Sequence, residues 1–204
     1  NSNVIKSLKK QRKTRDMDIR EKWDNKYETK LANMNTPVPN ERLLYIAPCL
    51  RGGAALDIAC GLGGNSFFLA ENGFNVTAVD ISEVAINYVK EKAVSNGLQI
   101  KSLAADLSNP VSTLFRKSYD LVLITYFLDR ALFPKVKGMV KDKGFFFMET
   151  FYRTMEGGNQ AISEKYKLES NELLKEFKDW KILYFEENEQ EGRQTIFCQK
   201  YKQA

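Results

Sequence analysis

Short apolar runs and longer segments of mixed polarity alternate along the middle of the chain. The apolar runs have the length and residue types of buried strands, and they lie at about residues 53–58, 74–79, 98–104, 119–125 and 144–151. The segments between them that predict helices lie at 64–72, 82–96 and about 129–140. Because strand and helix alternate, right-handed crossovers and a parallel sheet are expected.

The N-terminal part of the chain predicts two helices ahead of the first strand. Ile19, Trp23 and Tyr27 recur at i, i+4 and i+8, which is the spacing of one apolar stripe on a helix. The segment 36–40 interrupts this pattern, and its Asn40 can cap a second helix that runs to about residue 50.

The C-terminal part predicts a helix at Glu169–Phe177 and two strands at Lys181–Glu187 and Gln194–Tyr201. The polar loop 188–192 joins the two strands, which predicts that they pair antiparallel. We therefore expect an α/β fold with a doubly wound, mostly parallel seven-stranded sheet, a C-terminal antiparallel hairpin and helices on both faces.

Composition limits the size and the surroundings of this fold. At 204 residues, 43% of them hydrophobic, the chain can bury one full core. We expect a basic tail at 1–15 and a single domain at 16–204, with N-terminal helices at 16–50 and the sheet core at 51–204. No apolar run approaches the roughly 20 residues that a membrane span needs, so no membrane partner is expected.

Cysteine usage and the absence of histidine restrict the chemistry. Cys49, Cys60 and Cys198 are odd in number and lack close metal-ligand spacing, so we expect no metal site and a cytoplasmic location. The chain contains no histidine. This excludes Ser-His-Asp and Cys-His nucleophile systems and the commonest zinc sites.

The excess positive charge lies at the N-terminal end. The net charge is +5; residues 1–30 hold 10 Lys/Arg and 5 Asp/Glu, and the remainder has 21 of each. A basic tail could contact nucleic acid or an anionic surface. A solvated extension is the favoured interpretation for a run this short, and a protein that acts on RNA more often has basic residues across its catalytic face.

A glycine-rich turn between two acids carries the strongest chemical signal. Asp57 ends the first apolar run, the turn 59–64 follows, and Asp80 ends the second run. Glycine lets the backbone approach a ligand closely, and the helix after the turn directs its free N–H groups toward it. An acid at the end of the second strand is placed to hold two vicinal ribose hydroxyls. The pattern therefore predicts a nucleoside-cofactor site.

The type of cofactor follows from the residues of the turn. The dinucleotide fingerprint fails, because Ser66 stands where its third small residue is required. Asp57 beside the glycines would repel a pyrophosphate but could hold an ammonium or sulfonium group. A cation close to Gly61 together with a ribose on Asp80 describes S-adenosylmethionine. The turn could instead form without a ligand, but acids at the ends of three successive strands, with Asp106 as the third, favour the cofactor.

These residues resemble the first motif of the class I, Rossmann-like methyltransferases, acid-x-Gly-x-Gly-x-Gly, with Ala59 in place of the first glycine. Further blocks are similar to the tellurite-resistance-type small-molecule methyltransferases, and they lie at 22–27, 54–61, 79–82, 132–134 and 148–151. The resemblance covers about residues 20–200. It implies that Gly61 and Gly63 face the methionine end of the cofactor, Asp80 its ribose and Asp106 its adenine. The family's acceptor-side histidine has no counterpart in this chain. The cofactor-binding residues that we expect are Asp57, Ala59, Gly61, Gly63, Asn65, Asp80, Ile81, Asp106, Leu107 and Thr125.

Aromatic and arginine residues follow the fourth and fifth strands. Tyr126 and Arg130 come after the fourth, and Tyr152 and Arg153 come after the fifth. They form either an acceptor pocket or the upper rim of the core. We expect Tyr126, Arg130 and Arg153 to be catalytic, with the arginines orienting an anionic acceptor. An amine or hydroxyl acceptor would need a proton acceptor, and the candidates are Tyr126, Tyr152, Glu149 and Asp129.

We therefore expect an S-adenosylmethionine-dependent methyltransferase that acts by in-line transfer on a small-molecule acceptor, such as a soft nucleophile or a metalloid oxyanion. Nucleic acid is not expected as a partner, and the chain is expected to be a monomer or a homodimer. The alternatives are an RNA or protein methyltransferase guided by the basic tail, and a non-catalytic cofactor-binding domain. The exocyclic-amine motif Asn/Asp-Pro-Pro-Tyr/Phe is missing, because Ile-Thr-Tyr-Phe occupies 124–127.

Overall fold

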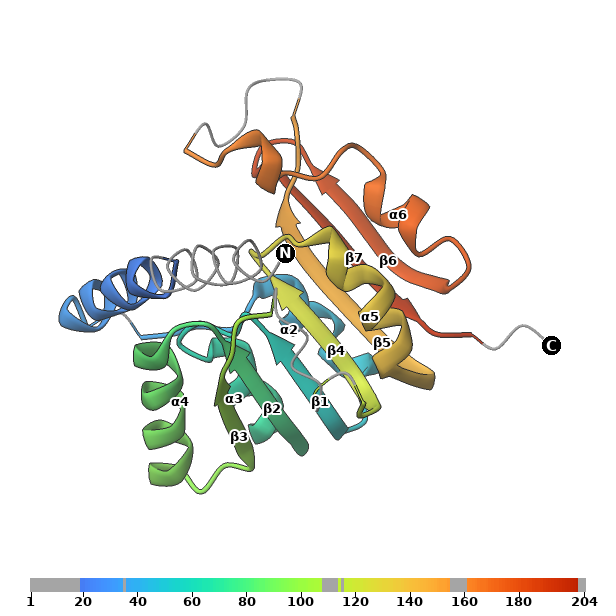
Figure 1. The fold of residues 1–204 in the computed structure, drawn as a ribbon. Coiled ribbons are helices and arrows are strands. Elements are labelled where there is room, and N and C mark those ends of the chain that lie inside the picture. Colours follow the sequence, from blue (N-terminus) through green and yellow to red (C-terminus); the bar gives the residue numbers. More distant parts are fainter. Residues whose placement is uncertain (1–18, 35, 108–113, 115, 155–160, 202–204) are drawn as a thin grey trace, which may run out of the picture.

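Seven strands form one mixed sheet (Figure 1). The computed structural model describes residues 19–34, 36–107, 114, 116–154 and 161–201. The strands are β1 (Gly53–Ile58), β2 (Phe74–Asp80), β3 (Ile100–Ala104), β4 (Tyr119–Thr125), β5 (Val140–Phe151), β6 (Lys181–Asn188) and β7 (Arg193–Gln199). Their order is β3-β2-β1-β4-β5-β7-β6. The first five strands pair parallel, and β7 pairs antiparallel with β5 and with β6. The expected fold class is confirmed.

The topology places a ligand site at one edge of the sheet. β1 pairs with β2 on one side and with β4 on the other, so the strand order reverses at β1. In open α/β sheets, ligands bind outside the carboxyl ends of the strands at such a switch point. The residues that end β1, β2, β4 and β5 are therefore the ones that can reach a common ligand.

Helices cover both faces of the sheet. They are α2 (Glu41–Ile46), α3 (Gly64–Glu71), α4 (Glu83–Ser95), α5 (Phe133–Met139) and α6 (Glu172–Glu176), with 3-10 turns at η1 (Ala47–Cys49), η2 (Arg130–Leu132) and η3 (Glu164–Tyr166). A further helix spans residues 19–32. In Figure 1, α5 crosses in front of the sheet and α2 and α3 lie behind it.

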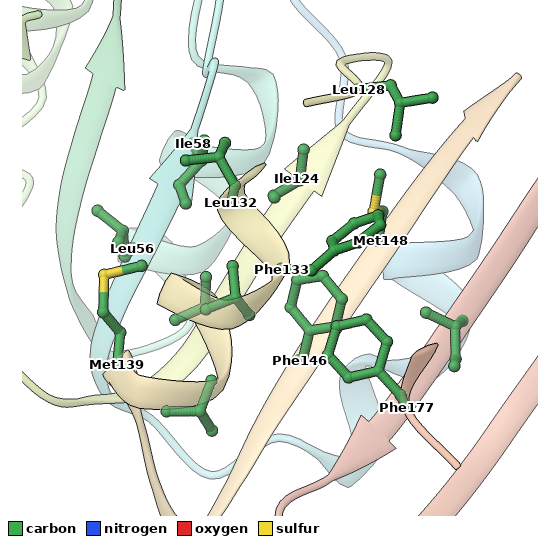
Figure 2. Close-up of a cluster of buried hydrophobic side chains, with 14 of the residues drawn as sticks. Leu56, Ile58, Ile124, Leu128, Leu132, Phe133, Met139, Phe146, Met148 and Phe177 are labelled. Atoms are coloured by element: carbon green, nitrogen blue, oxygen red, sulfur yellow. The ribbon is translucent and has the colours of Figure 1, made fainter. Parts of the chain in front are cut away.

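The alternation of side chains along the strands divides the core into two layers. In β4, Val122 and Ile124 pack into a layer with α5 and α6, and Leu121 and Leu123 pack into a layer with α2, α3 and α4. Successive side chains of a strand point to opposite faces, so a strand that is apolar at every position is buried on both. Figure 2 shows the first layer, where Phe146 and Phe177 lie face to face with ring centroids 4.6 Å apart. This double layer explains why the central strands read as continuous apolar runs.

Several boundaries differ by a few residues from the sequence-based expectation, and two of these differences have a local cause. β5 begins at Val140 instead of 144, because Val140 pairs with Tyr119 before a register shift in β4. α6 begins at Glu172 instead of 169, because Asn171 adopts a left-handed conformation (φ 60°) that a helix cannot include. The predicted tail at 1–15 lies outside the described residues, and the division of the chain into tail and domain stays a prediction. No helix in the described ranges is long and apolar enough to cross a membrane.

Candidate active site

The turn after β1 has a left-handed backbone at three positions. Ala59, Gly61 and Gly63 have φ values of 57°, 54° and 82°. Glycine adopts this conformation freely, whereas at Ala59 it costs on the order of 1 kcal/mol. The backbone N–H of Gly61 donates to Asp80 Oδ2 at 2.8 Å, which ties the turn to the end of β2. The turn is thus a strained and fixed segment, and backbone strain of this kind is frequent at functional sites.

Asp57 in β1 has a fully buried carboxyl group, and one of its two oxygens has no hydrogen-bond partner among the described residues. The Ser66 hydroxyl donates to its Oδ2 at 2.6 Å, and its Oδ1 is buried without a hydrogen-bond partner among the described residues. Burial, together with the nearby charge of Asp80, raises the pKa of Asp57 to about 7. A positive charge beside Oδ1 would favour the ionised form. The group is therefore suited to a cationic ligand.

Asp80 ends β2 and is buried as well. Its Oδ1 accepts from the Ser82 backbone N–H at 3.0 Å, and its Oδ2 accepts from Gly61. Burial raises the pKa of Asp80 above its ordinary value, although these backbone hydrogen bonds act in the opposite direction. A carboxylate has about four lone-pair sites, so each oxygen can still accept a further donor, such as a ribose hydroxyl. The half-buried Ile81 follows it.

The helix at 19–32 lies over the glycine turn. A Cβ at Gly61 would stand only 2.9 Å from the Tyr27 hydroxyl oxygen, so a larger residue at 61 would collide with Tyr27. Burial raises the pKa of Tyr27 strongly, and the charges of Asp80 and Asp57 contribute to the shift. The Tyr27 hydroxyl is therefore held in neutral form beside the two acids. Trp23 stacks on Tyr27 with ring centroids 5.8 Å apart.

The other expected cofactor residues surround the same strand ends. Asn65, at the start of α3, donates from Nδ2 to Thr125 Oγ1 at 3.0 Å and so joins α3 to the end of β4. Asp106 follows β3 and is half-buried. The backbone N–H of Ala105 donates to the Asp80 carbonyl at 2.8 Å, which brings the end of β3 to the end of β2. Leu107 is buried in the α5 layer of the core.

This donor set fits S-adenosylmethionine. The unpaired, buried Oδ1 of Asp57 suits the positive charge of the methionine end, and glycine adopts the left-handed backbone at positions 61 and 63 freely. Asp80 offers carboxylate oxygens at the end of β2. Among the described residues, no group of three potential metal ligands occurs.

A second polar cluster joins the ends of β4, β5 and β7 to the start of α2. Its centre is Glu149, which is completely buried. Glu149 Oε1 accepts from the Asn40 side chain at 2.6 Å and from the Tyr126 hydroxyl at 2.8 Å. Glu149 Oε2 accepts from the Thr195 hydroxyl at 2.9 Å. Two arginines complete the set: Arg42 Nε and Arg193 Nη1 each lie 3.5 Å from a Glu149 oxygen. The buried charge is thus paired and hydrogen-bonded on both oxygens.

Tyr126 is the exposed member of this cluster. Its φ is 56°, an uncommon conformation for a non-glycine residue, and its hydroxyl also accepts from Asn40 at 2.9 Å and from Arg193 at 3.1 Å. The Arg193 guanidinium lies 5.0 Å from the centroid of the Tyr126 ring. Arg193 Nε is buried and has no hydrogen-bond partner among the described residues.

Arg130 and Arg153 lie apart from this cluster, in ion pairs on the surface. Arg130 donates from Nε and Nη2 to the two carboxylate oxygens of Glu172, at 2.6 and 2.8 Å. Arg153 pairs with Glu164 at 3.1 Å and also with Glu169. Arg130 and Arg153 line one surface pocket together with these three glutamates, and Tyr126 is not among the lining residues.

Sequence reasoning missed four members of the cluster, which are Asn40, Arg42, Arg193 and Thr195. Asn40 was expected only as a helix cap, a role that it does have, because its side chain accepts from the Leu43 backbone N–H. The sequence pattern did not mark Arg42 or Arg193 as site residues, because neither follows a parallel strand. Arg193 does follow Gly192 in the hairpin loop and starts β7, and the antiparallel pairing opposite Phe151 is what brings it to the end of β5.

A family model described as tellurite resistance protein TehB matches residues 20–197. The probable S-adenosyl-L-methionine-dependent methyltransferase TehB of Haemophilus influenzae (strain ATCC 51907 / DSM 11121 / KW20 / Rd) is 26% identical over 156 residues, which cover 74% of this chain and 52% of that protein. The chain thus spans about half the length of this curated relative.

Solved structures show the same fold. The crystal structure of TehB from Haemophilus influenzae superposes with a TM-score of 0.72 at 22% identity, over 81% of this chain and 64% of that one. Coclaurine N-methyltransferase, solved with N-methylheliamine and SAH bound, superposes with a TM-score of 0.56 at 18% identity, over 70% of this chain and 49% of that one.

Proposed function

This chain belongs to the TehB family of tellurite resistance proteins, and from that premise we propose that it is a class I S-adenosylmethionine-dependent methyltransferase that methylates a small, soft or anionic acceptor. A thiolate or a metalloid oxyanion belongs to this class. Such nucleophiles need little help from a general base. The proton-accepting groups described at the strand ends are already hydrogen-bonded, which favours an acceptor of this kind.

The observation that carries the proposal is that the four candidate bases are already engaged. The Tyr126 hydroxyl donates to Glu149 and accepts from Asn40 and Arg193, and burial together with Glu149 raises the pKa of Tyr126 to about 12. The Tyr152 hydroxyl donates to Glu189 at 2.5 Å, and its pKa is raised as well.

The two carboxylates also accept hydrogen bonds, Glu149 on both oxygens and Asp129 on one. Glu149 accepts hydrogen bonds on both oxygens within its cluster. Asp129 caps η2, because its Oδ1 accepts from the Ala131 backbone N–H at 3.0 Å. An acceptor that has to lose a proton during transfer would find no prepared base among these groups.

In the mechanism that we propose, S-adenosylmethionine supplies an activated methyl group on a sulfonium. Asp57 would hold the positive end of the cofactor through its unpaired Oδ1, and Asp80 would hold the ribose hydroxyls. Asp106 would accept from the adenine amino group. Gly61 and Gly63 would face the methionine part, and Asn65 with Thr125 fixes the adjoining end of β4. The residues of the chain thus position the reactants and exclude water.

The acceptor site that we propose lies at the ends of β4 and β5, with Tyr126 as a wall. Phe151 lies beside it, with ring centroids 6.0 Å apart. We assign to Arg193 the orienting role expected of Arg130 and Arg153. Its Nη1 pairs with Glu149 and Glu191, but its Nε has no hydrogen-bond partner among the described residues, whereas Arg130 and Arg153 pair with glutamates through Nε. A guanidinium can orient an anionic acceptor with two parallel hydrogen bonds.

The direct test is methyl transfer from radiolabelled S-adenosylmethionine to a panel of thiols, selenite, tellurite and bulk RNA. We expect transfer to a thiol or an oxyanion and none to RNA. The Arg193→Gln variant should raise the KM for an anionic acceptor about tenfold or more. Arg153→Gln, which removes a surface cation at the neighbouring strand end, is the matched control and should leave KM unchanged. Methylation of RNA or protein alone would contradict the proposal and favour a role of the basic tail in docking.

A further inference from the structure

The helix at 19–32 is attached to the segment that follows Asp80. Asp24 Oδ1 accepts from the Ser82 hydroxyl at 2.5 Å and from the Val84 backbone N–H at 3.2 Å. Arg20 forms an ion pair with Glu83 at 2.5 Å, next to this contact but more exposed to solvent. These partners form the start of α4, and Figure 1 shows the helix (blue) close to α4. The part-buried contact of Asp24 and the more exposed ion pair of Arg20 therefore connect the same two helices.

Ser82 links Asp24 to the ribose acid. Its backbone N–H donates to Asp80 Oδ1 at 3.0 Å, and its hydroxyl donates to Asp24. The same hydroxyl oxygen accepts from the Ala85 backbone N–H and so caps α4. Ser82 is completely buried. A displacement of Asp24 would therefore release a hydrogen bond on the residue that orients the Asp80 carboxylate.

The same side of this helix also contacts the glycine turn. Tyr27 follows Asp24 by three residues, so both project from one side of the helix. Tyr27 is buried with Leu62 and Ala85, and its hydroxyl oxygen lies beside Gly61. The helix thus spans the two segments that hold the cofactor, the turn after β1 and the loop after β2.

We propose that Asp24 is a positioning residue for the cofactor. It ties the helix at 19–32 to the loop after β2, keeps Tyr27 over the glycine turn and, through Ser82, holds Asp80 in the orientation that receives the ribose. Asp24 itself does not touch the cofactor. The proposal holds only if the ribose binds at Asp80, as proposed above.

The test measures binding of S-adenosylhomocysteine to the full chain. Trp23 lies on the helix in question, and the chain has one other tryptophan, Trp180, which packs against Phe177 in the α5 layer. In a Trp180→Phe background, the fluorescence of Trp23 reports the helix directly. Calorimetry gives the Kd, and stopped-flow displacement by excess S-adenosylmethionine gives the dissociation rate.

Three variants separate the possible roles of Asp24. Asp24→Ala removes both hydrogen bonds and should speed dissociation about tenfold, with a matching rise in Kd. Asp24→Asn keeps the Oδ1 acceptor and should stay within about twofold of wild type, which a requirement for the charge would not allow. Glu83→Ala removes the outer ion pair between the same helices and should also stay within about twofold. Near-ultraviolet circular dichroism checks that each variant is folded at the temperature used.

Each outcome decides the matter. Loss in Asp24→Ala with retention in Asp24→Asn and Glu83→Ala supports the positioning role. Unchanged dissociation in Asp24→Ala overturns it, and so does an equal loss in Asp24→Asn. A wild-type chain that binds neither S-adenosylmethionine nor its product overturns the proposed cofactor site together with the role of Asp24, whereas normal binding by Asp24→Ala overturns only the latter.

Discussion

The two halves of the candidate site are built in opposite ways. At the cofactor end, Asp57 keeps a buried oxygen without a hydrogen-bond partner among the described residues. At the acceptor end, Glu149 accepts on both oxygens, Arg42 and Arg193 flank it, and the buried atom without a partner among the described residues is a donor, Arg193 Nε. An unpaired buried group is costly until a ligand completes it, whereas a satisfied acid is held rigidly by its own partners. The first end is therefore arranged to gain a cationic ligand, and the second to present a fixed wall with one unpaired donor.

The halves also differ in how the chain supplies their residues. The cofactor end comes mainly from one continuous stretch, 57–66, together with the loop at 80–84. The acceptor end gathers Asn40, Tyr126, Glu149 and Arg193 from four separate segments. A change at the acceptor end should therefore weaken the fold, and a change at the cofactor end should weaken ligand binding.

The largest expected effect is on stability at the acceptor end. Glu149→Gln removes the buried negative charge beside Arg42 and Arg193 while keeping the side-chain shape. It should lower the free energy of unfolding by about 3–5 kcal/mol, because it removes the buried carboxylate that accepts from Asn40, Tyr126 and Thr195. Urea denaturation of the apo protein measures this change. If stability fell by no more than it does for a surface glutamate, the network would not be the rigid element described above.

The next effect is on binding at the cofactor end. Asp80→Ala should weaken the binding of S-adenosylmethionine by about 2–4 kcal/mol, because two charge-assisted hydrogen bonds to the ribose are lost. Calorimetry measures the affinity, and Glu149→Gln serves as the contrast that loses stability but keeps the cofactor. Unchanged affinity in Asp80→Ala would show that the ribose lies elsewhere.

A smaller effect is expected from pH. Asp57 has a pKa of about 7 in the folded protein, so it is largely protonated at pH 6 and largely ionised at pH 8. A cationic ligand prefers the ionised form, and the affinity for S-adenosylmethionine should rise about tenfold from pH 6 to pH 8. Titration calorimetry across this range tests it, with Asp57→Asn expected to remove the rise. A wild-type affinity that does not change with pH would contradict the proposal that the cationic end of the cofactor binds at Asp57 Oδ1.

The contribution of Asp57 to the stability of the apo protein should change with pH in the opposite direction to the cofactor affinity. Because the folded pKa of Asp57 lies above the ordinary value of about 4, the folded apo protein binds more protons than the unfolded chain between pH 4 and 7. The contribution of Asp57 to the free energy of unfolding is therefore highest below pH 4, falls as the pH rises to about 7 and then levels off. Comparison of wild type with Asp57→Asn by denaturation at several pH values isolates it.

The smallest expected effect comes from the N-terminal tail. Deletion of residues 1–15 should leave melting and cofactor affinity nearly unchanged, because the predicted tail has few apolar residues to bury. Deletion of residues 1–30 also removes Trp23 and Tyr27, and it should lower the melting temperature or weaken cofactor binding. Thermal melting with and without S-adenosylhomocysteine distinguishes the two. An equal loss from both truncations would mean that the tail belongs to the cofactor end.

The fold and the cofactor end could be predicted because both depend on local patterns. The strands buried on both faces are apolar at consecutive positions, and the turn at 59–64 needs its small residues within one short stretch. The start of α6 was wrong by three residues, because no local pattern distinguishes Asn171 in a left-handed conformation from Asn171 in a helix.

The acceptor end was decided by tertiary structure. The sequence alone placed Arg130 and Arg153 after strands, but Glu172, Glu164 and Glu169, which pair with them, reach them only when the chain returns after β5. In the same way, the antiparallel pairing of β7 with β5 brings Arg193 to Tyr126 and Glu149. Ion pairs between distant segments leave no periodic signal in the sequence, because their partners are chosen by the register of the folded sheet.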